Sequence, residues 1–132
     1  MNTVIIGVGS NIEAPRHVAQ AKKLLSKEQH FLKESTFIAT SPIGFTDQSD
    51  FLNGAFEIET EMDADAFRAY LKNLENRLGR VRTGDKNGPR VIDLDIIIWN
   101  GAIVSDDYYE RDFVRNAVNE LMPNLGGGIK YQ

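Results

Sequence analysis

The chain has 132 residues, of which 42% are hydrophobic and 26% are charged, with a net charge of −4 and no cysteine. These values are typical of a soluble globular protein, and we expect residues 1–132 to form a single domain. The acidic balance argues against binding of nucleic acid by bulk electrostatics, and the lack of cysteine excludes disulfides, zinc–thiolate sites and cysteine nucleophiles. Neither a signal peptide nor an apolar run of membrane-spanning length is evident, so we expect a cytoplasmic protein without a membrane partner.

The first forty residues predict a strand, a helix and a second strand. β-branched residues over 3–8 indicate the first strand. Gly7 and residues 9–11 form a small-residue exit, for which an ordinary turn is favoured over a loop beside a ligand. Apolar residues at helical spacing predict an amphipathic helix over 15–27, and residues 31–40 are expected to form the next strand. Neither histidine of the chain is predicted to be a ligand.

A loop and a third strand carry the first candidate binding residues. The loop covers 41–50, and within it Pro42–Gly44 can turn backbone N–H and C=O groups outward, toward the edge of a planar heterocycle. A plain connection between strands explains the same residues. Alternation over 51–59 predicts a strand that places Phe51 and Asn53 on one face, as stacking combined with hydrogen bonding requires. A pair that faces solvent is the alternative.

The next segment predicts a helix and then a basic loop. Asp63 or Asp65 can cap the helix, an apolar stripe runs from Phe67 to Leu78, and Gly79 suits the C-terminal cap. The loop that follows contains two glycines and a proline, and its cations suit phosphate charge: Arg80, Arg82, Lys86 and Arg90. A solvated charged loop is the alternative, which we favour less because two acids follow directly.

Those two acids interrupt an apolar strand that runs to Trp99. Asp93 and Asp95 are two residues apart, so both carboxylates should project from the same face of the strand. Two like charges this close repel each other, and a divalent cation removes the conflict. Hard oxygen ligands suit Mg²⁺, which takes its remaining ligands from water and substrate phosphates. The alternative is a strand whose acids face solvent.

The rest of the chain predicts a hairpin turn at Asn100–Gly101, a short strand over 102–104 and a helix over 108–121. Pro123 follows the helical pattern as a stop. The order of elements up to residue 99 is strand, helix, strand, strand, helix, strand, which indicates an α/β protein.

Together these residues resemble the 6-hydroxymethyl-7,8-dihydropterin pyrophosphokinase family. The signature runs Gly88-Pro89-Arg90-x-x-Asp93-Leu94-Asp95-Ile96-Ile97. Other elements fall in the expected order: Gly9-Ser10-Asn11, Thr40-Ser41-Pro42-Ile43-Gly44, Asp50-Phe51-Leu52-Asn53 and Glu75 through Gly79-Arg80-Val81-Arg82. The resemblance implies an α+β fold, a ferredoxin-like sandwich with a mainly antiparallel sheet.

The resemblance also implies an activity in folate biosynthesis. The expected reaction is Mg-dependent transfer of diphosphate from ATP to the hydroxymethyl group of 6-hydroxymethyl-7,8-dihydropterin, which gives AMP and the pterin diphosphate. Two Mg²⁺ ions are expected, with ATP as co-substrate. We expect small molecules as the only partners, and a monomer.

The roles implied for individual residues fall into four groups. The metal ligands are Asp93 and Asp95, and the residues implied in catalysis are Arg80, Arg82, Arg90 and Asp95. The pterin site is Thr40, Pro42, Ile43, Gly44, Phe51, Asn53 and Phe113, with the two phenylalanines sandwiching the ring. The nucleotide site is Glu75, Arg82, Arg90, Ile96 and Arg111.

The chain departs from the family pattern after Val104. The family commonly carries a Pro-His element before the position of Arg111, and residues 104–110 contain no histidine but three acids, Asp106, Asp107 and Glu110. Ala117 replaces a proline, and Arg115 and Asn116 replace apolar residues. Two alternatives therefore stay open. One is a non-catalytic or altered-substrate pterin-binding relative, and the other is a ferredoxin-like interaction domain that uses none of these residues.

Overall fold

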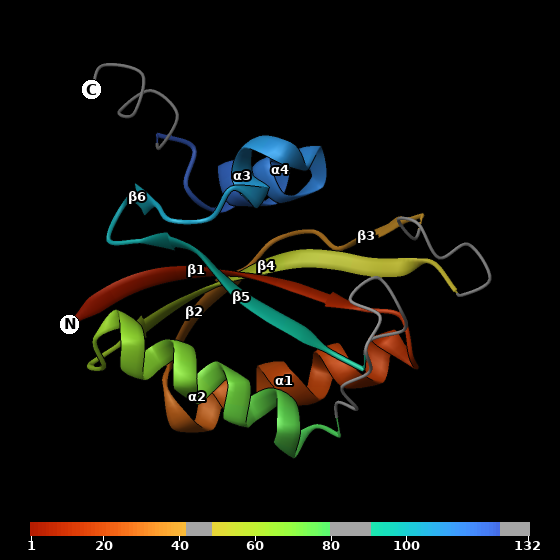
Figure 1. Cartoon of the computed structure of the whole chain (residues 1–132), viewed down its shortest axis with the longest axis horizontal. Helices are drawn as coiled ribbons and strands as arrows, with labels where there is room; N and C mark the ends of the chain where they lie inside the picture. The colour runs from red at the N-terminus through yellow and green to blue at the C-terminus, as the bar shows by residue number, and fades with distance from the viewer. Residues whose placement is uncertain (42–48, 80–90, 125–132) are drawn as a thin grey trace.

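Within the described residues, 1–41, 49–79 and 91–124, the computed structural model has one antiparallel sheet between two layers of helices (Figure 1). The elements in chain order are β1 Asn2–Ser10, α1 Ala14–Glu28, β2 His30–Glu34, β3 Ile38–Thr40, β4 Phe51–Thr60, α2 Ala64–Arg77, β5 Asp93–Trp99, β6 Ala102–Ile103, α3 Asp107–Glu110 and α4 Asp112–Leu121. Six predicted site residues lie outside the described ranges: Pro42, Ile43, Gly44, Arg80, Arg82 and Arg90.

The sheet has the strand order β2-β4-β1-β5-β6, with β3 also paired to β4. Every described pairing is antiparallel. With α1 and α2 on one face, this order confirms the expected ferredoxin-like α+β sandwich (Figure 1). No helix in the described part of the chain combines the length and apolar character needed to cross a bilayer.

Each face of the sheet has its own apolar core. On one face, alternate residues of β1, β4 and β5 pack with α1 and α2, among them Ile6, Phe56 and Leu94. On the other face, Ile5, Ala55, Ile97 and Ile98 pack with α3 and α4. A register shift between β1 and β5 at Ile5/Ile6 lets two consecutive residues, Ile97 and Ile98, face the same side. The α3–α4 layer covers only part of its face, and the rest stays open.

The predicted strand over 31–40 is interrupted, and β2 and β3 pair separately with β4. Between them, the Ser35 backbone N–H donates to the Ala55 carbonyl at 2.9 Å, and the Ser35 hydroxyl accepts from the Ala55 N–H at 2.8 Å. The Phe37 ring then lies over Gly54, where an added Cβ would come within 2.5 Å of it. Because the Ser35 hydroxyl bonds to the backbone of β4, it interrupts the regular hydrogen-bond ladder between β4 and residues 31–40. Composition alone did not indicate this interruption.

The predicted helix over 108–121 is also interrupted, because Arg111 has extended backbone angles, φ −128° and ψ 113°. Arg115 donates to the carbonyls of Tyr108 and Tyr109, both at 3.2 Å, and so satisfies groups that the short α3 leaves without helical partners. These bonds give the cation at position 115 a structural role, although the resemblance implies an apolar residue there.

Other local predictions are confirmed. Asp63 caps α2, since its carboxylate accepts from the Ala66 N–H at 2.8 Å. Gly79 ends that helix with φ +92°, and Asn100 and Gly101 have φ +50° and +84°, as the hairpin turn requires. His17 is buried and His30 is exposed, so both are the packing or surface residues expected.

Glu28 joins the end of α1 to α2 and should contribute to stability. Its carboxylate accepts hydrogen bonds from the Tyr70 hydroxyl at 2.9 Å and from the Arg77 guanidinium, which lowers the pKa of Glu28 to about 2. Because the folded-state pKa is depressed, this stability is present above about pH 4.5 and is lost as the pH falls toward 2. We expect Glu28→Gln to cost about 0.5–1 kcal/mol at pH 7, measured by urea unfolding.

Glu13→Gln is the matched control for this prediction. Glu13 also pairs with an arginine, Arg16, but within one turn of one helix and with both side chains more than half exposed. Its replacement should change the unfolding free energy less than Glu28→Gln does. Unfolding curves of Glu28→Gln and the unaltered protein that coincide at pH 7 would contradict the assignment.

Candidate active site

A pocket of about 200 Å³ opens on the part of the sheet that α3 and α4 leave uncovered. Its walls come from β1, β3, β4, β5, α3 and α4. The structure brings together there seven of the residues proposed from the sequence: Thr40, Phe51, Asn53, Asp93, Asp95, Arg111 and Phe113. Segments separated by more than fifty residues therefore meet in one cavity.

Two glycines of the central strand form the floor of this pocket. The register aligns Asn53, Gly9 and Asp93 in one row across β4, β1 and β5, and it pairs Gly7 with Asp95 in the next row on the same face. Strands lie about 4.8 Å apart, so Asn53 and Asp93 flank a bare strip about 10 Å wide. Gly7 and Gly9 are strand residues, so the turn predicted at this position begins only after Ser10.

Asn53 and Thr40 form a fixed polar pair at one side of the floor. The Asn53 amide Nδ2 donates to the Thr40 hydroxyl at 2.6 Å, which leaves the Thr40 proton available to a ligand. The Asn53 Oδ1 lies over Gly9, where an added Cβ would stand only 2.7 Å from it. Phe51 from β4 and Phe113 from α4 supply aromatic surface to the same cavity. The arrangement suits a flat ring that carries both hydrogen-bond donors and acceptors.

Asp93 and Asp95 stand at the other side of the floor. Both carboxylates line the pocket, as their two-residue spacing predicted. Withdrawal from water and then the charge of Asp93 raise the pKa of Asp95 to about 6, while Lys72 opposes the shift. Solvent still reaches part of the Asp95 side chain through the open pocket. Two carboxylates that disfavour each other's charge are a suitable pair of ligands for a divalent cation.

The donor set tests whether Mg²⁺ fits this site. Among the described residues, no group of three or more His, Cys, Asp or Glu side chains is arranged to hold a metal ion. Mg²⁺ commonly needs only one or two protein carboxylates, because water and substrate phosphates complete its octahedron. The pair Asp93 and Asp95 therefore fits Mg²⁺ that arrives with a phosphate substrate.

Arg111 and Asp107 form the third side of the pocket. The extended conformation at Arg111 follows α3, and the Arg111 Nε lies 3.5 Å from the Asp107 Oδ1. Asp107 lines the pocket, and its charge contributes to the raised pKa of Asp95. From the sequence, Asp107 was noted only as one of three acids in a segment that departs from the family pattern. Its four-residue spacing from Arg111 was the signal that it could hold the guanidinium.

Glu75 and Ile96, predicted to contact nucleotide, do not line this pocket. Ile96 belongs to the core beneath the sheet, with α1 and α2. Glu75 is fully buried on α2, where its Oε2 accepts from the Leu94 N–H at 2.7 Å. The pocket opens on the opposite face, so the nucleotide role of these two residues rests on the resemblance.

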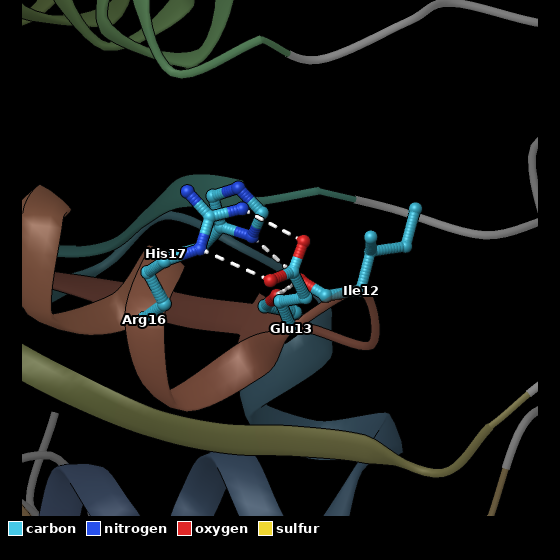
Figure 2. A network of polar contacts seen from close by, with 5 residues as sticks. Ile12, Glu13, Arg16 and His17 are labelled. Carbon is cyan, nitrogen blue, oxygen red and sulfur yellow. Dashed lines mark hydrogen bonds and ion pairs between the residues drawn. The ribbon is translucent and has the colours of Figure 1, made fainter.

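The turn that leads out of β1 is held by a small polar network (Figure 2). His17 Nδ1 lies 2.5 Å from the carbonyl oxygen of Ile12, and Arg16 pairs with Glu13, whose φ is +44°. One residue earlier, Asn11 donates to the Ser49 carbonyl at 3.1 Å. The bond between Asn11 and Ser49 ties the end of the pocket floor to the segment that precedes Phe51.

Comparison with known proteins identifies the family to which the chain is similar. The family model described as 7,8-dihydro-6-hydroxymethylpterin-pyrophosphokinase (HPPK) matches residues 5–123. The chain is 35% identical to the 2-amino-4-hydroxy-6-hydroxymethyldihydropteridine pyrophosphokinase of Bacillus subtilis, over 91% of this chain and 78% of that protein. The enzyme of the same name from Methylorubrum extorquens is also 35% identical, over 95% and 85%.

A longer relative matches over only part of its length. The folic acid synthesis protein FOL1 of Dictyostelium discoideum is 35% identical over 94% of this chain, which spans only 20% of that protein. The match over residues 5–123, together with relatives of which the chain covers 78% and 85%, shows that the chain belongs to the 7,8-dihydro-6-hydroxymethylpterin-pyrophosphokinase family.

Proposed function

We propose that this protein transfers diphosphate from ATP to the hydroxymethyl group of 6-hydroxymethyl-7,8-dihydropterin, with release of AMP. Family membership and the names of the relatives support diphosphokinase activity in folate biosynthesis. The observation that carries the proposal is the single row Asn53–Gly9–Asp93, which joins a ring-binding side and a metal-binding side across one bare floor.

The pterin ring lies over the glycine floor in this proposal. Phe51 and Phe113 stack on its faces, and Thr40 and Asn53 bond to the polar edge of the ring. Backbone groups of Pro42–Gly44 are proposed to complete that edge on the strength of the resemblance. The ring would then be oriented so that its hydroxymethyl group points toward Asp93 and Asp95.

The phosphate side uses the acids and the cations. Asp93 and Asp95 would hold two Mg²⁺ ions, which supply positive charge to the phosphate oxygens when bound. The pterin hydroxyl oxygen forms a bond to the β-phosphorus of ATP, the bond from that phosphorus to the bridging oxygen of the α-phosphate breaks, and the hydroxyl proton passes to solvent. Arg111 would bind a phosphate, and Arg80, Arg82 and Arg90 are proposed on the resemblance alone to steady the rest.

Formation of AMP tests the proposal. Purified protein mixed with Mg-ATP and hydroxymethyldihydropterin should produce AMP and pterin diphosphate in equal amounts, and omission of either the pterin or Mg²⁺ should abolish both. Pterin binding without AMP above background would overturn the enzyme assignment. We further propose that the protein is cytoplasmic and monomeric. Sedimentation at micromolar concentration tests the monomeric state.

One observation favours a second candidate, a pterin-binding relative without catalysis. Asp107 pairs with Arg111 inside the pocket, so an incoming phosphate must compete with a carboxylate for that guanidinium. Calorimetry separates the two candidates. Pterin affinity that rises strongly with Mg²⁺ and a non-hydrolysable ATP analogue supports the enzyme, and affinity indifferent to both supports the binding protein.

A further inference from the structure

We propose that Glu75 is a positioning residue that acts from beneath the sheet: its carboxylate fixes the backbone between Asp93 and Asp95, so that both acids keep the geometry that a divalent cation requires. The inference rests on the proposed function of the pocket. It assigns Glu75 a role different from contact with nucleotide.

The hydrogen bond itself is the first observation. Leu94 lies between the two acids, and its N–H donates to the Glu75 Oε2 at 2.7 Å, with Glu75 fully buried and Leu94 only 1% exposed. The side chain of Leu94 packs on the α1–α2 side, whereas Asp93 and Asp95 face the pocket. Glu75 therefore holds the strand at the N–H of Leu94, the residue that separates the two acids, without entering the cavity.

The place of this bond in the sheet explains why it is needed. β5 pairs with β1 on one side, but β6 pairs only with Ile98 and Trp99 on the other. Within residues 1–41, 49–79 and 91–124, no strand other than β1 pairs with β5 at Leu94, so this part of β5 is an edge of the described sheet. An unbonded N–H in this buried setting is unfavourable, and without the bond the start of β5 would be free to shift.

The use of a carboxylate here is the third observation. Burial of a charged group is costly unless it is paired and hydrogen-bonded, and helix α2 still places one fully beneath the sheet. Lys72, with 45% of its side chain exposed, lies 3.8 Å away and offsets part of that cost. A hydrogen bond to a charged acceptor is stronger and shorter than one to a neutral acceptor, which suits a strand whose side chains must be placed within fractions of an ångström.

Three substitutions distinguish positioning through the hydrogen bond to Leu94 from an effect of the negative charge of Glu75. Glu75→Gln keeps the length and one acceptor oxygen but removes the charge, Glu75→Asp keeps the charge but falls short of Leu94, and Glu75→Leu keeps the bulk but has no acceptor. If Glu75 positions the acids through its hydrogen bond, the affinity for the divalent cation should be highest in Glu75→Gln, lower in Glu75→Asp and lowest in Glu75→Leu. Charge or direct nucleotide contact predicts that Asp exceeds Gln.

Two measurements that need no turnover provide the readout. Mn²⁺ binding in the presence of a non-hydrolysable ATP analogue, followed by the electron paramagnetic resonance of free Mn²⁺, should weaken less than about threefold for Glu75→Gln and about 10–100-fold for Glu75→Leu. Hydrogen exchange of the Leu94 amide should accelerate in Glu75→Asp and Glu75→Leu only. Pterin affinity, measured by calorimetry, should change less than about threefold in every variant that retains the wild-type fold.

Several outcomes would overturn the positioning role. They are the reverse order of Asp and Gln, unchanged exchange at Leu94 in Glu75→Asp, or pterin affinity that falls in parallel with Mn²⁺ affinity. Failure of the proposed function is distinct, because it shows as absence of AMP from the unaltered protein. Exchange at Leu94 still tests the structural bond in that case, since it depends on neither ATP nor turnover.

Discussion

Replacement of Asp95 by asparagine is expected to abolish diphosphate transfer and to stabilise the metal-free protein at the same time. Activity should fall at least about 10³-fold if Asp95 has its proposed role, because a ligand of a cation that neutralises phosphate charge is worth several kcal/mol in the transition state. Stability should rise, because burial and the charge of Asp93 oppose ionisation of Asp95 in the folded state. One substitution then separates the demands of folding from those of catalysis.

The dependence on pH follows from the sign of the shift. The pKa of Asp95 is raised from 3.8 to about 6, so the stability that its protonated form contributes is complete below about pH 4 and is lost as the pH rises through 6. Asparagine does not ionise, so the stability of Asp95→Asn relative to the unaltered protein should increase as the pH rises from 4 to 7. Above pH 7 we expect the free energy of unfolding of Asp95→Asn to exceed that of the unaltered protein by about 1 kcal/mol, a value discounted for the solvent that reaches this side chain. This corresponds to a rise in Tm of about 3–5 °C.

Melting curves from pH 4 to pH 8 in the presence of a chelator, together with the AMP assay, check this prediction. Asp107→Asn is the matched control, because Asp107 lines the same pocket but ranks last among the groups that shift Asp95. It should raise Tm less than Asp95→Asn at pH 7. Retained AMP formation by Asp95→Asn, or a Tm below that of the unaltered protein, would contradict the assignment of Asp95.

Alanine at Gly9 is expected to weaken pterin binding about 100-fold while the fold is retained. The added Cβ would lie 2.7 Å from the Asn53 Oδ1, so the amide must leave its place and its bond to Thr40 is strained or lost. Two hydrogen bonds to the ring edge, each worth about 1–1.5 kcal/mol, would be compromised, which corresponds to about two orders of magnitude in Kd. Calorimetric titration with the pterin measures the loss.

Gly7→Ala provides the comparison within the same strand. Its Cβ would meet Ile97 at 3.4 Å, an ordinary contact, and it touches neither Asn53 nor Thr40. We expect Gly7→Ala to reduce pterin affinity less than about tenfold, because its methyl group would only raise the surface on which the ring lies. A Gly9→Ala protein that binds pterin within threefold of the unaltered protein, or a Gly7→Ala protein that binds more weakly than Gly9→Ala, would refute the role given to the Asn53–Gly9 contact.

The sequence by itself determined the features that depend on short spacing. Because side chains of a strand alternate with a period of two, the shared face of Asp93 and Asp95 and that of Phe51 and Asn53 followed from their spacing alone. Caps and turns such as Asp63, Gly79 and Asn100–Gly101 are similarly local. The family resemblance then supplied the ferredoxin-like fold and the binding roles of the seven predicted residues that line the pocket.

Only the tertiary structure decided how these local features meet. The row Asn53–Gly9–Asp93 depends on the register of three strands whose aligned residues lie at least 40 positions apart in sequence, and no local pattern encodes a register between distant strands. The bond from the Leu94 N–H to Glu75 likewise joins a strand to a helix 19 residues earlier, at a part of β5 that β6 does not reach. Spacing thus predicted which face each side chain occupies, whereas hydrogen bonds between distant segments decided which side chains become neighbours.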